Sequence, residues 1–260
     1  MRIRAVIWLH IIRFWRYKYS FMSMVVSNAM WILLLILGVL LFVPEGELVY
    51  ALRSSYWTIA CWSVISGFSS LVGGWTNFFI SLGMVEEHLL SGVSPFFVIG
   101  GRMIIAMIIS IVTLAFMGVL TQSIFSVDIL SSGNPHLMAL SFTIVALESL
   151  AYSLTVSALA MRMNVSEHFL ELINFAVVGL LIIPLKSLPE RARLFYLTIP
   201  YVAPTYMLKC SIGAEDPSLF HLALAISLLE TVLLWLISLL AMRMTEKYIM
   251  ENCVRAIGFY

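Results

Sequence analysis

Charged residues are scarce in this chain, and their scarcity excludes several classes of protein. Asp, Glu, Lys and Arg make up 11% of the 260 residues, whereas a soluble domain carries about 25%. Hydrophobic residues make up 62%, the mean hydropathy is +1.01 and the net charge is +1. These values exclude a soluble enzyme, a nucleic-acid-binding domain and a disordered chain. The apolar residues form long blocks with the charges between them, which is typical of a polytopic α-helical membrane protein.

Cysteine is rarer still, with only Cys61, Cys210 and Cys253. Cys61 falls inside an apolar block and the other two near opposite membrane faces, so we expect three unpaired thiols. No Cys-x-x-Cys or Cys/His spacing indicates a metal site. Charged and aromatic residues precede the first apolar block, so we expect a retained helix there and not a cleaved signal peptide.

Catalytic motifs are also missing. No Gly is followed by Lys, so the phosphate-binding motif Gly-x-x-x-x-Gly-Lys-Ser/Thr does not occur, and neither HExxH nor GxSxG is found. We therefore predict no enzyme and no catalytic, cofactor-binding or metal-binding residue. The histidines lie near the ends of apolar blocks, where we expect interfacial polar residues: His10, His88, His136, His168 and His221.

Six largely apolar blocks reach or approach the length of about 20 residues that a membrane-spanning helix needs. They are residues 22–42, 56–82, 102–125, 137–161, 169–185 and 218–242. We predict an all-α integral membrane protein that forms a single transmembrane domain over residues 1–260. An even number of spans puts both termini on one side, and the bias of Lys and Arg places that side in the cytoplasm. The basic residues that then lie outside are Arg53, Lys186, Arg191, Arg193 and Lys209.

Three further segments complete the expected topology. Residues 1–21 place apolar and basic residues on opposite helix faces and are rich in Trp and Tyr, so we predict a helix lying in the membrane interface. Residues 186–217 contain too many prolines for one helix, yet keep apolar stretches. They fit either short broken helices that re-enter the membrane from outside, which we favour, or an ordinary surface loop. Residues 243–260 are expected to form a cytoplasmic tail.

The loop between the second and third spans combines acidic and apolar residues. Glu86 and Glu87 precede the pair Leu89-Leu90, a Gly-Val-Ser-Pro break follows, and Gly101-Arg102 begins the third span. A short helix that projects into the cytoplasm and a solvated linker both fit this composition.

This order of elements resembles the permease subunits of ABC-2 type exporters. The loop of that family typically reads Gly-Thr-Leu-Glu-x-Leu-Leu-x-x-Pro and is followed by Gly-Lys or Gly-Arg. Gly83, Glu86 or Glu87, Leu89-Leu90 and Gly101-Arg102 match this pattern, although one extra residue follows Gly83 and Val93 lies near the family's proline. A second match joins the apolar-Pro segment 179–189 to the Pro-aromatic segment 199–209, so the resemblance covers nearly the whole chain.

The resemblance implies a transport subunit driven by separate proteins. This permease would pair with a second copy or a paralogue and bind two ABC ATPase subunits, which hold ATP and Mg, at the cell membrane. Residues 83–95 would form the coupling helix, with the interfacial helix as the other contact. The residues implied in ATPase coupling are Gly83, Glu86, Glu87, His88, Leu89 and Leu90. This chain itself would hold no cofactor and bind no nucleic acid, and its exported substrate is not specified.

Two carboxylates lie inside otherwise uncharged spans, Glu148 and Glu230. Counting from the cytoplasmic ends of their spans puts both at roughly 20 Å depth. They either contact a substrate or gate its path, or they are neutral and bonded to neighbours such as Ser149, Ser153 or Thr231. The resemblance adds Asn77 and Asn174, with the small residues of the second span, as candidates for lining the path.

Two other functions remain open at this stage. A self-sufficient channel or secondary carrier would use Glu148 and Glu230 as titratable gates, although the halves of the chain show no inverted repeat. A structural or assembly protein of the membrane would transport nothing itself. The acidic Leu-Leu loop favours the exporter subunit.

Overall fold

The computed structural model describes residues 2–131, 133–163 and 167–252, and these ranges are helical without any strand. In chain order the elements are α1 (Arg2–Arg16), α2 (Lys18–Leu40), η1 (Glu45–Glu47), α3 (Leu48–Phe68), η2 (Ser69–Gly74), α4 (Trp75–Ser81), α5 (Met84–Leu90), α6 (Pro95–Gly100), α7 (Met103–Phe125), α8 (Pro135–Arg162), α9 (Glu167–Ile182), η3 (Leu185–Ser187), α10 (Glu190–Leu197), α11 (Val202–Ser211), η4 (Pro217–Leu219) and α12 (Phe220–Asn252). The all-α class is confirmed.

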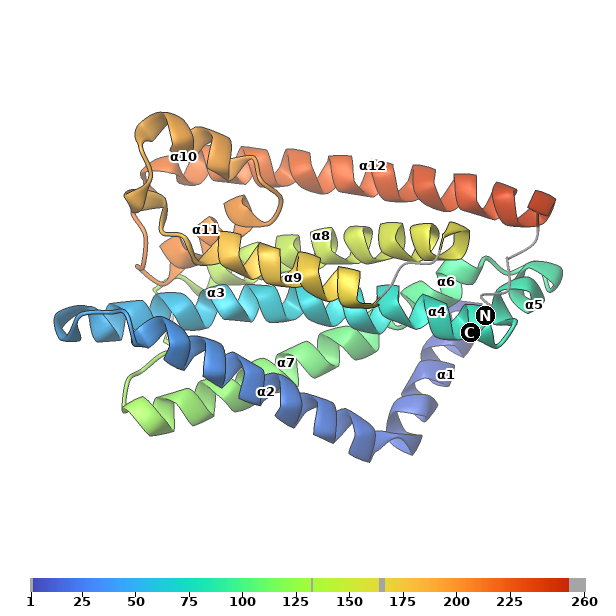
Figure 1. Cartoon of the computed structure of the whole chain (residues 1–260), viewed down its shortest axis with the longest axis horizontal. Coiled ribbons are helices and arrows are strands. Elements are labelled where there is room, and N and C mark those ends of the chain that lie inside the picture. The colour runs from blue at the N-terminus through green and yellow to red at the C-terminus, as the bar shows by residue number, and fades with distance from the viewer. Residues whose placement is uncertain (1, 132, 164–166, 253–260) are drawn as a thin grey trace.

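Helix α3 is the central element of the bundle. In Figure 1 it runs along the middle of the long axis, with α8, α9 and α12 on one side and α2 and α7 on the other. It contacts α2, α7, α8, α9 and α11, and the residues from Tyr56 to Ile65 are all buried. A helix that is apolar on all sides is stable only when other helices surround it, so the uninterrupted apolar run of this segment gives α3 its place in the core.

Four helical segments are long and apolar enough to cross a membrane: Lys18–Leu40, Pro95–Phe125, Pro135–Arg162 and Pro217–Asn252. A fifth is added if Leu48–Ser81 and Met84–Leu90, which meet at 85°, count as one broken span. The apolar helix over the predicted fifth span, Leu170–Ile182, is shorter than these. The described residues therefore contain four to five candidate spans, which is compatible with a multi-pass membrane protein.

Several predicted boundaries differ from the structure. The predicted interfacial segment 1–21 is divided, because α1 ends at Arg16 and α2 already begins at Lys18. The predicted span 169–185 ends at Ile182, as expected for a helix that approaches Pro184. Two predictions fall partly outside the described residues: Cys253 in the tail, and the side chain of His168. Cys61 and Cys210 are unpaired, as predicted.

The predicted cytoplasmic tail is helical over much of its length. Helix α12 continues through residues 243–252, where Ile249 is buried and Thr245 Oγ1 donates to Ala158 O of α8 at 3.2 Å. Lys247 and Glu251 lie one helical turn apart, with 3.9 Å between Nζ and Oε1. The sequence interpretation stopped the helix at the first charges, whereas packing on α8 extends it.

The segment 186–217 consists of short helices broken at most of its prolines, whereas Pro204 lies inside α11. Helix α11 is buried against α3, α8 and α12 over almost its whole length. Lys209, which we expected on the outer surface, is 4% exposed, and its Nζ donates to Leu181 O at 2.8 Å. Glu215, also buried, accepts from the Leu185 amide at 3.3 Å. These polar contacts hold the segment inside the bundle, so it is not an ordinary surface loop.

A π-helical turn, η2, lies between α3 and α4 and has no counterpart in the sequence-based expectations. Gly73 in this turn faces α8 so closely that a Cβ there would lie 3.1 Å from Val156 Cγ1. A Cβ on the next residue, Gly74, would meet only Ser69 O at 3.8 Å. The small residues of the second predicted span therefore serve close helix packing at Gly73 in particular.

The different surroundings of Gly73 and Gly74 predict different stabilities for their alanine variants. Gly73→Ala should lower the free energy of unfolding by about 1 kcal/mol relative to Gly74→Ala, because overpacking a close contact costs ~1–3 kcal/mol. The helix-propensity gain of alanine is common to both variants. Unfolding in mixed detergent micelles measures the difference, and equal stabilities would contradict the described contact between η2 and α8.

Candidate functional site

The predicted coupling loop forms a short helix at one tip of the molecule. Gly83 adopts φ +67°, a left-handed conformation that glycine permits, and α5 begins at the next residue. The axis turns by 85° from Leu48–Ser81 into α5. Gly92, with φ +68°, follows the helix before Pro95 starts α6. Of the two alternatives for this loop, the short projecting helix is the one present (Figure 1).

The side chains of α5 divide into an inner and an outer set. Val85 is fully buried, and Leu89 packs against the hydrophobic core. Glu87 is exposed, and Leu90 is 90% exposed. The Leu-Leu pair is therefore split between an anchor, Leu89, and a projecting side chain, Leu90. The outer face combines one carboxylate with one large apolar group, a composition suited to contact with another protein.

His88 connects α5 to the rest of the tip. Its ring centroid lies 6.1 Å from that of Phe79 in α4. Partial burial lowers the pKa of His88; the nearby Glu87 raises this pKa, and the positive charge of Arg13 in α1 lowers it. The imidazole is therefore a neutral packing group near neutral pH, between α4, α5 and α1.

The turn after α5 is attached to α12. Ser94 Oγ donates a hydrogen bond to Glu246 Oε1, and the Val93 amide donates to His88 O at 2.9 Å. A displacement of α5 would thus be transmitted to α12 as well as to α4. Such stiffness is what a mechanical contact requires.

The two carboxylates inside candidate spans lie in helices that pack against each other, α8 and α12. Glu148 of α8 is 0% exposed and interacts electrostatically with Glu230 of α12. Thr231 Oγ1 lies 3.1 Å from Glu148 Oε1 and 2.8 Å from Ser227 O. A hydroxyl has one proton to donate, so a protonated Glu148 carboxyl completes both bonds. Thr231 is one of the partners expected from the sequence.

The remaining carboxyl oxygens of Glu148 and Glu230 lack hydrogen bonds. Glu148 Oε2 and both oxygens of Glu230 are buried and have no hydrogen-bond partner among the described residues. Two buried like charges without a cation would be strongly unfavourable in hydrocarbon. The arrangement therefore favours neutral carboxyl groups.

A polar cavity of about 440 Å³ lies between α2, α3 and α9. Asn174 lines it, as do the small residues Ser63, Ser66, Gly67 and Ser70 of the second predicted span. Trp62 Nε1 donates to Asn174 O at 2.8 Å and so holds α9 against α3. Asn77, the other path candidate, lies half-buried in α4 and is not among the residues that line this cavity.

Sequence reasoning missed two residues of this cavity, Asn28 and Glu171. Glu171 and Asn174 are three residues apart and therefore share a helix face, and Asn28 is a polar side chain inside an apolar block. Both signals were present in the sequence. Only the packing of α2 beside α9 brings them together.

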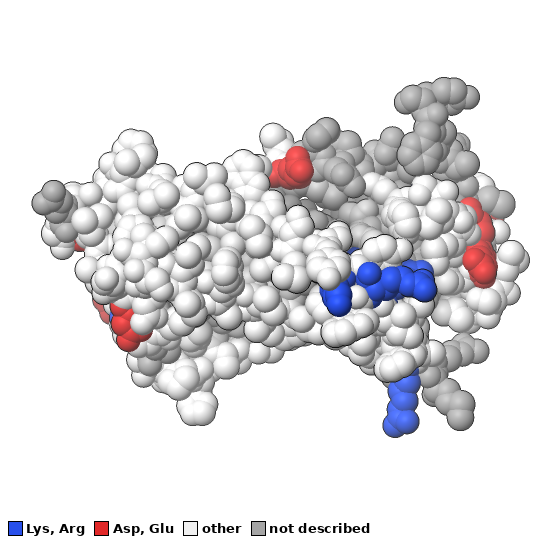
Figure 2. Space-filling view, turned by 90° about the horizontal axis from the view of Figure 1, so that it is seen from below, with Lys and Arg blue, Asp and Glu red and all other residues white. Residues whose placement is uncertain are grey.

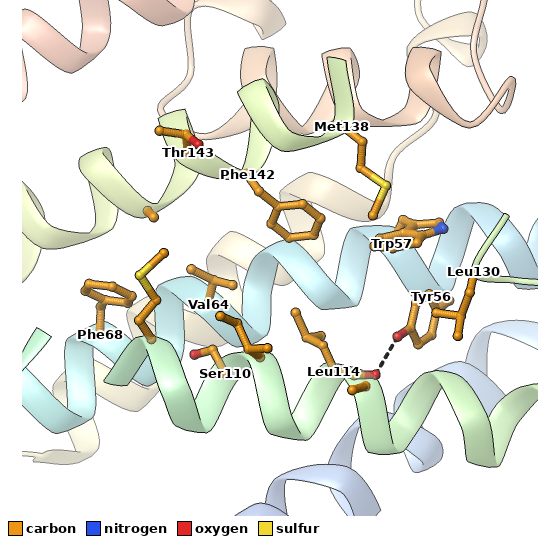
Figure 3. A pocket seen from close by; sticks show the side chains of 14 residues that line it. Tyr56, Trp57, Val64, Phe68, Ser110, Leu114, Leu130, Met138, Phe142 and Thr143 are labelled. Carbon is orange, nitrogen blue, oxygen red and sulfur yellow. Dashed lines mark hydrogen bonds between the residues drawn. The ribbon is translucent and has the colours of Figure 1, made fainter. Parts of the chain in front are cut away.

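A second cavity, of about 300 Å³, is almost entirely apolar and lies between α3, α7 and α8 (Figure 3). Trp57, Phe68 and Phe142 contribute aromatic walls, and Tyr56 Oη donates to Leu114 O at 2.7 Å. None of the predicted site residues lines this cavity. It offers room for an apolar group and no charge for catalysis.

Comparison with models of known protein families, with curated proteins and with solved structures yields no match to this chain.

Removing the contact between Thr231 and Glu148 should lower the stability of the protein. Thr231→Val should lower the free energy of unfolding by about 1–3 kcal/mol, because it leaves another buried carboxyl oxygen without a partner. Thr143→Val is the matched control, since that hydroxyl is exposed and donates only to Ala139 O of its own helix. Equal effects of the two substitutions, measured by unfolding in detergent, would contradict the buried bond.

Proposed function

We propose that this chain is the transmembrane permease subunit of an ATP-binding cassette exporter. The main support for this proposal is α5, a short helix turned by 85° at the tip of the bundle, with Glu87 and Leu90 directed outward. A channel or a carrier that works alone has no need of such a projecting, well-anchored contact. An ATPase subunit, which would hold ATP and Mg, is the partner that this surface would serve.

The proposed topology has six spans in the cell membrane and both termini in the cytoplasm. Helix α9 would be the fifth span, α10 and α11 would re-enter from outside, and α1 would lie in the interface. Support comes from Figure 1, where the start of α1, helix α5 and the end of α12 lie at the same end of the molecule. The exposed aromatic side chains Trp8, Trp15, Tyr17 and Tyr19 fit a helix at the headgroup level.

Coupling would proceed through the contacts of α5. Closure of two ATPase subunits would press on Glu86, Glu87 and Leu90, and the motion would pass through Ser94 to α12. The substrate path would lie at the seam with a second copy or a paralogue. The polar cavity between α2, α3 and α9 supports that position, because hydroxyl and amide groups there lie at the side of a single chain.

Charge reversal on α5 tests this assignment. Glu86→Lys combined with Glu87→Lys should reduce co-purification of the ATPase subunit and ATP-driven export by about tenfold or more, because like charges at an interface cost several kcal/mol. The same double reversal at Glu45 and Glu47, in η1 at the opposite end, is the control and should retain wild-type levels.

A photoreactive residue identifies the partner in the same membranes. Placed at Leu90, it should capture a polypeptide that contains Gly-x-x-x-x-Gly-Lys-Ser/Thr and binds ATP. Placed at Phe42, which is 88% exposed beyond the other end of α2, it should not. Wild-type association and export by the α5 double variant would remove α5 from the coupling role.

A self-sufficient channel or carrier is the second candidate, favoured by the proximity of Glu148 and Glu230. If the exporter proposal is right, liposomes containing only this chain leak protons and sodium ions no faster than liposomes containing the Glu148→Gln, Glu230→Gln variant. A flux that the wild-type chain carries unaided, and that the double variant abolishes, would establish the second candidate instead.

A further inference from the structure

A cationic pocket lies between the interfacial helix and the bundle, apart from α5 and from the buried carboxylates. Its volume is about 520 Å³, and α1, α2, α4 and α7 contribute to its walls. Arg13 and Arg102 provide the charge, and Phe14 and Trp75 provide aromatic surface. In Figure 2 the basic side chains on the lower face gather in the half of the molecule that holds α1 and α5 in Figure 1, with no acidic side chain among them.

Arg102 is held in a defined position without a charged partner. Its side chain is 3% exposed, and its guanidinium carbon lies 3.1 Å from the ring centroid of Trp75. Stacking of this kind fixes the plane of the guanidinium and directs its N–H groups to the side. Among the described residues, Arg102 Nε and Arg13 Nη1 are buried without a hydrogen-bond acceptor, and neither side chain forms an ion pair.

The packing of α1 accounts for the shape of the pocket. A Cβ at Gly101 would lie 2.4 Å from Val6 Cγ1, so only glycine lets α1 approach the start of α7 so closely. His10 of α1 is buried and donates from Nε2 to Val98 O at 2.9 Å. Burial lowers the pKa of His10 despite this bond, and the charges of Arg102 and Arg13 lower it further. A neutral His10 thus anchors α1, while Gly101-Arg102 places the guanidinium in the pocket.

Arg102 is buried and Arg13 is half-buried, and two such neighbouring guanidinium groups without an anion are unfavourable, so the pocket calls for a negatively charged ligand. Guanidinium groups pair well with phosphate oxygens through parallel N–H···O bonds. Part of the remaining wall is apolar, since Phe21 and Met24 continue from the pocket along α2, a candidate span. An anionic headgroup beside an apolar wall is the chemistry of a phospholipid.

We propose that Arg13 and Arg102 bind the phosphate group of an anionic phospholipid, whose acyl chains lie along the first turns of α2. The lipid completes the contact between α1 and the bundle and neutralises both guanidinium groups. Such a site requires only that α2 lies in a membrane, whether or not the chain serves an ATPase.

Native mass spectrometry of the purified full chain in a neutral detergent tests the site. Titrated with dioleoylphosphatidylglycerol, the wild-type chain should bind one copy about tenfold more tightly than dioleoylphosphatidylcholine. Arg13→Gln and Arg102→Gln should each weaken phosphatidylglycerol binding by about tenfold, the usual effect of losing one charge-assisted bond. Arg16→Gln changes the same charge on an exposed position of α1 outside the pocket and should retain wild-type affinity.

Inorganic phosphate distinguishes a lipid from a soluble anion. Excess inorganic phosphate should leave the bound phosphatidylglycerol in place. Displacement of the lipid by inorganic phosphate at a concentration comparable to that of the lipid would mean a soluble phosphate site and would overturn the lipid assignment. If Arg102→Gln does not fold, Arg13→Gln decides alone, since Arg13 is only half-buried. Unchanged lipid binding by a folded Arg13→Gln variant would overturn the proposal.

Discussion

Hydrocarbon offers no hydrogen bonds, and this one constraint explains most of the structure. Every polar group in the apolar part of the chain must find a partner within the bundle or reach the membrane surface. Hydroxyl groups along α8 accordingly donate to carbonyls one turn earlier, as Ser149, Ser153 and Ser157 do. Glu148 meets Thr231, and Lys209 meets Leu181 O. Several buried polar atoms among the described residues still lack a partner, and the most informative of them belong to Arg102 and to the carboxyl pair.

The tip of the molecule is one connected unit assembled from segments far apart in the sequence. Helix α5 is attached to α12 through Ser94 and Glu246, and α1 is attached to α6 through His10 and Val98. The two contacts that an ATPase would use under the proposed function therefore belong to the same body. A lipid phosphate held by Arg13 and Arg102 would lie between that body and α2, where it would influence how firmly α1 is docked.

The sequence predicted the helical class and the multi-pass character, because each depends on local composition. For the loop around Leu89-Leu90, composition fitted a short helix and a solvated linker equally, and only the family resemblance implied the helix. The sequence also placed Glu148 and Glu230 at one depth, since helical rise converts residue number into distance. The boundaries predicted for α2 and α12 were wrong by several residues. Charge was taken to end a helix there, whereas aromatic and tertiary contacts continue it.

Residues whose roles depend on neighbouring helices could not be predicted in this way. Lys209 was expected in solvent, and it is buried because α11 folds back into the bundle. The roles of Gly73 and Gly101 follow from how closely α8 and α1 approach them. Composition and spacing by themselves determined that this chain forms apolar helices and where its breaks fall, because backbone hydrogen bonding and hydropathy act over a few residues. Only the tertiary structure decided which polar groups meet and which remain open to a ligand, because those contacts join residues that are far apart in the sequence.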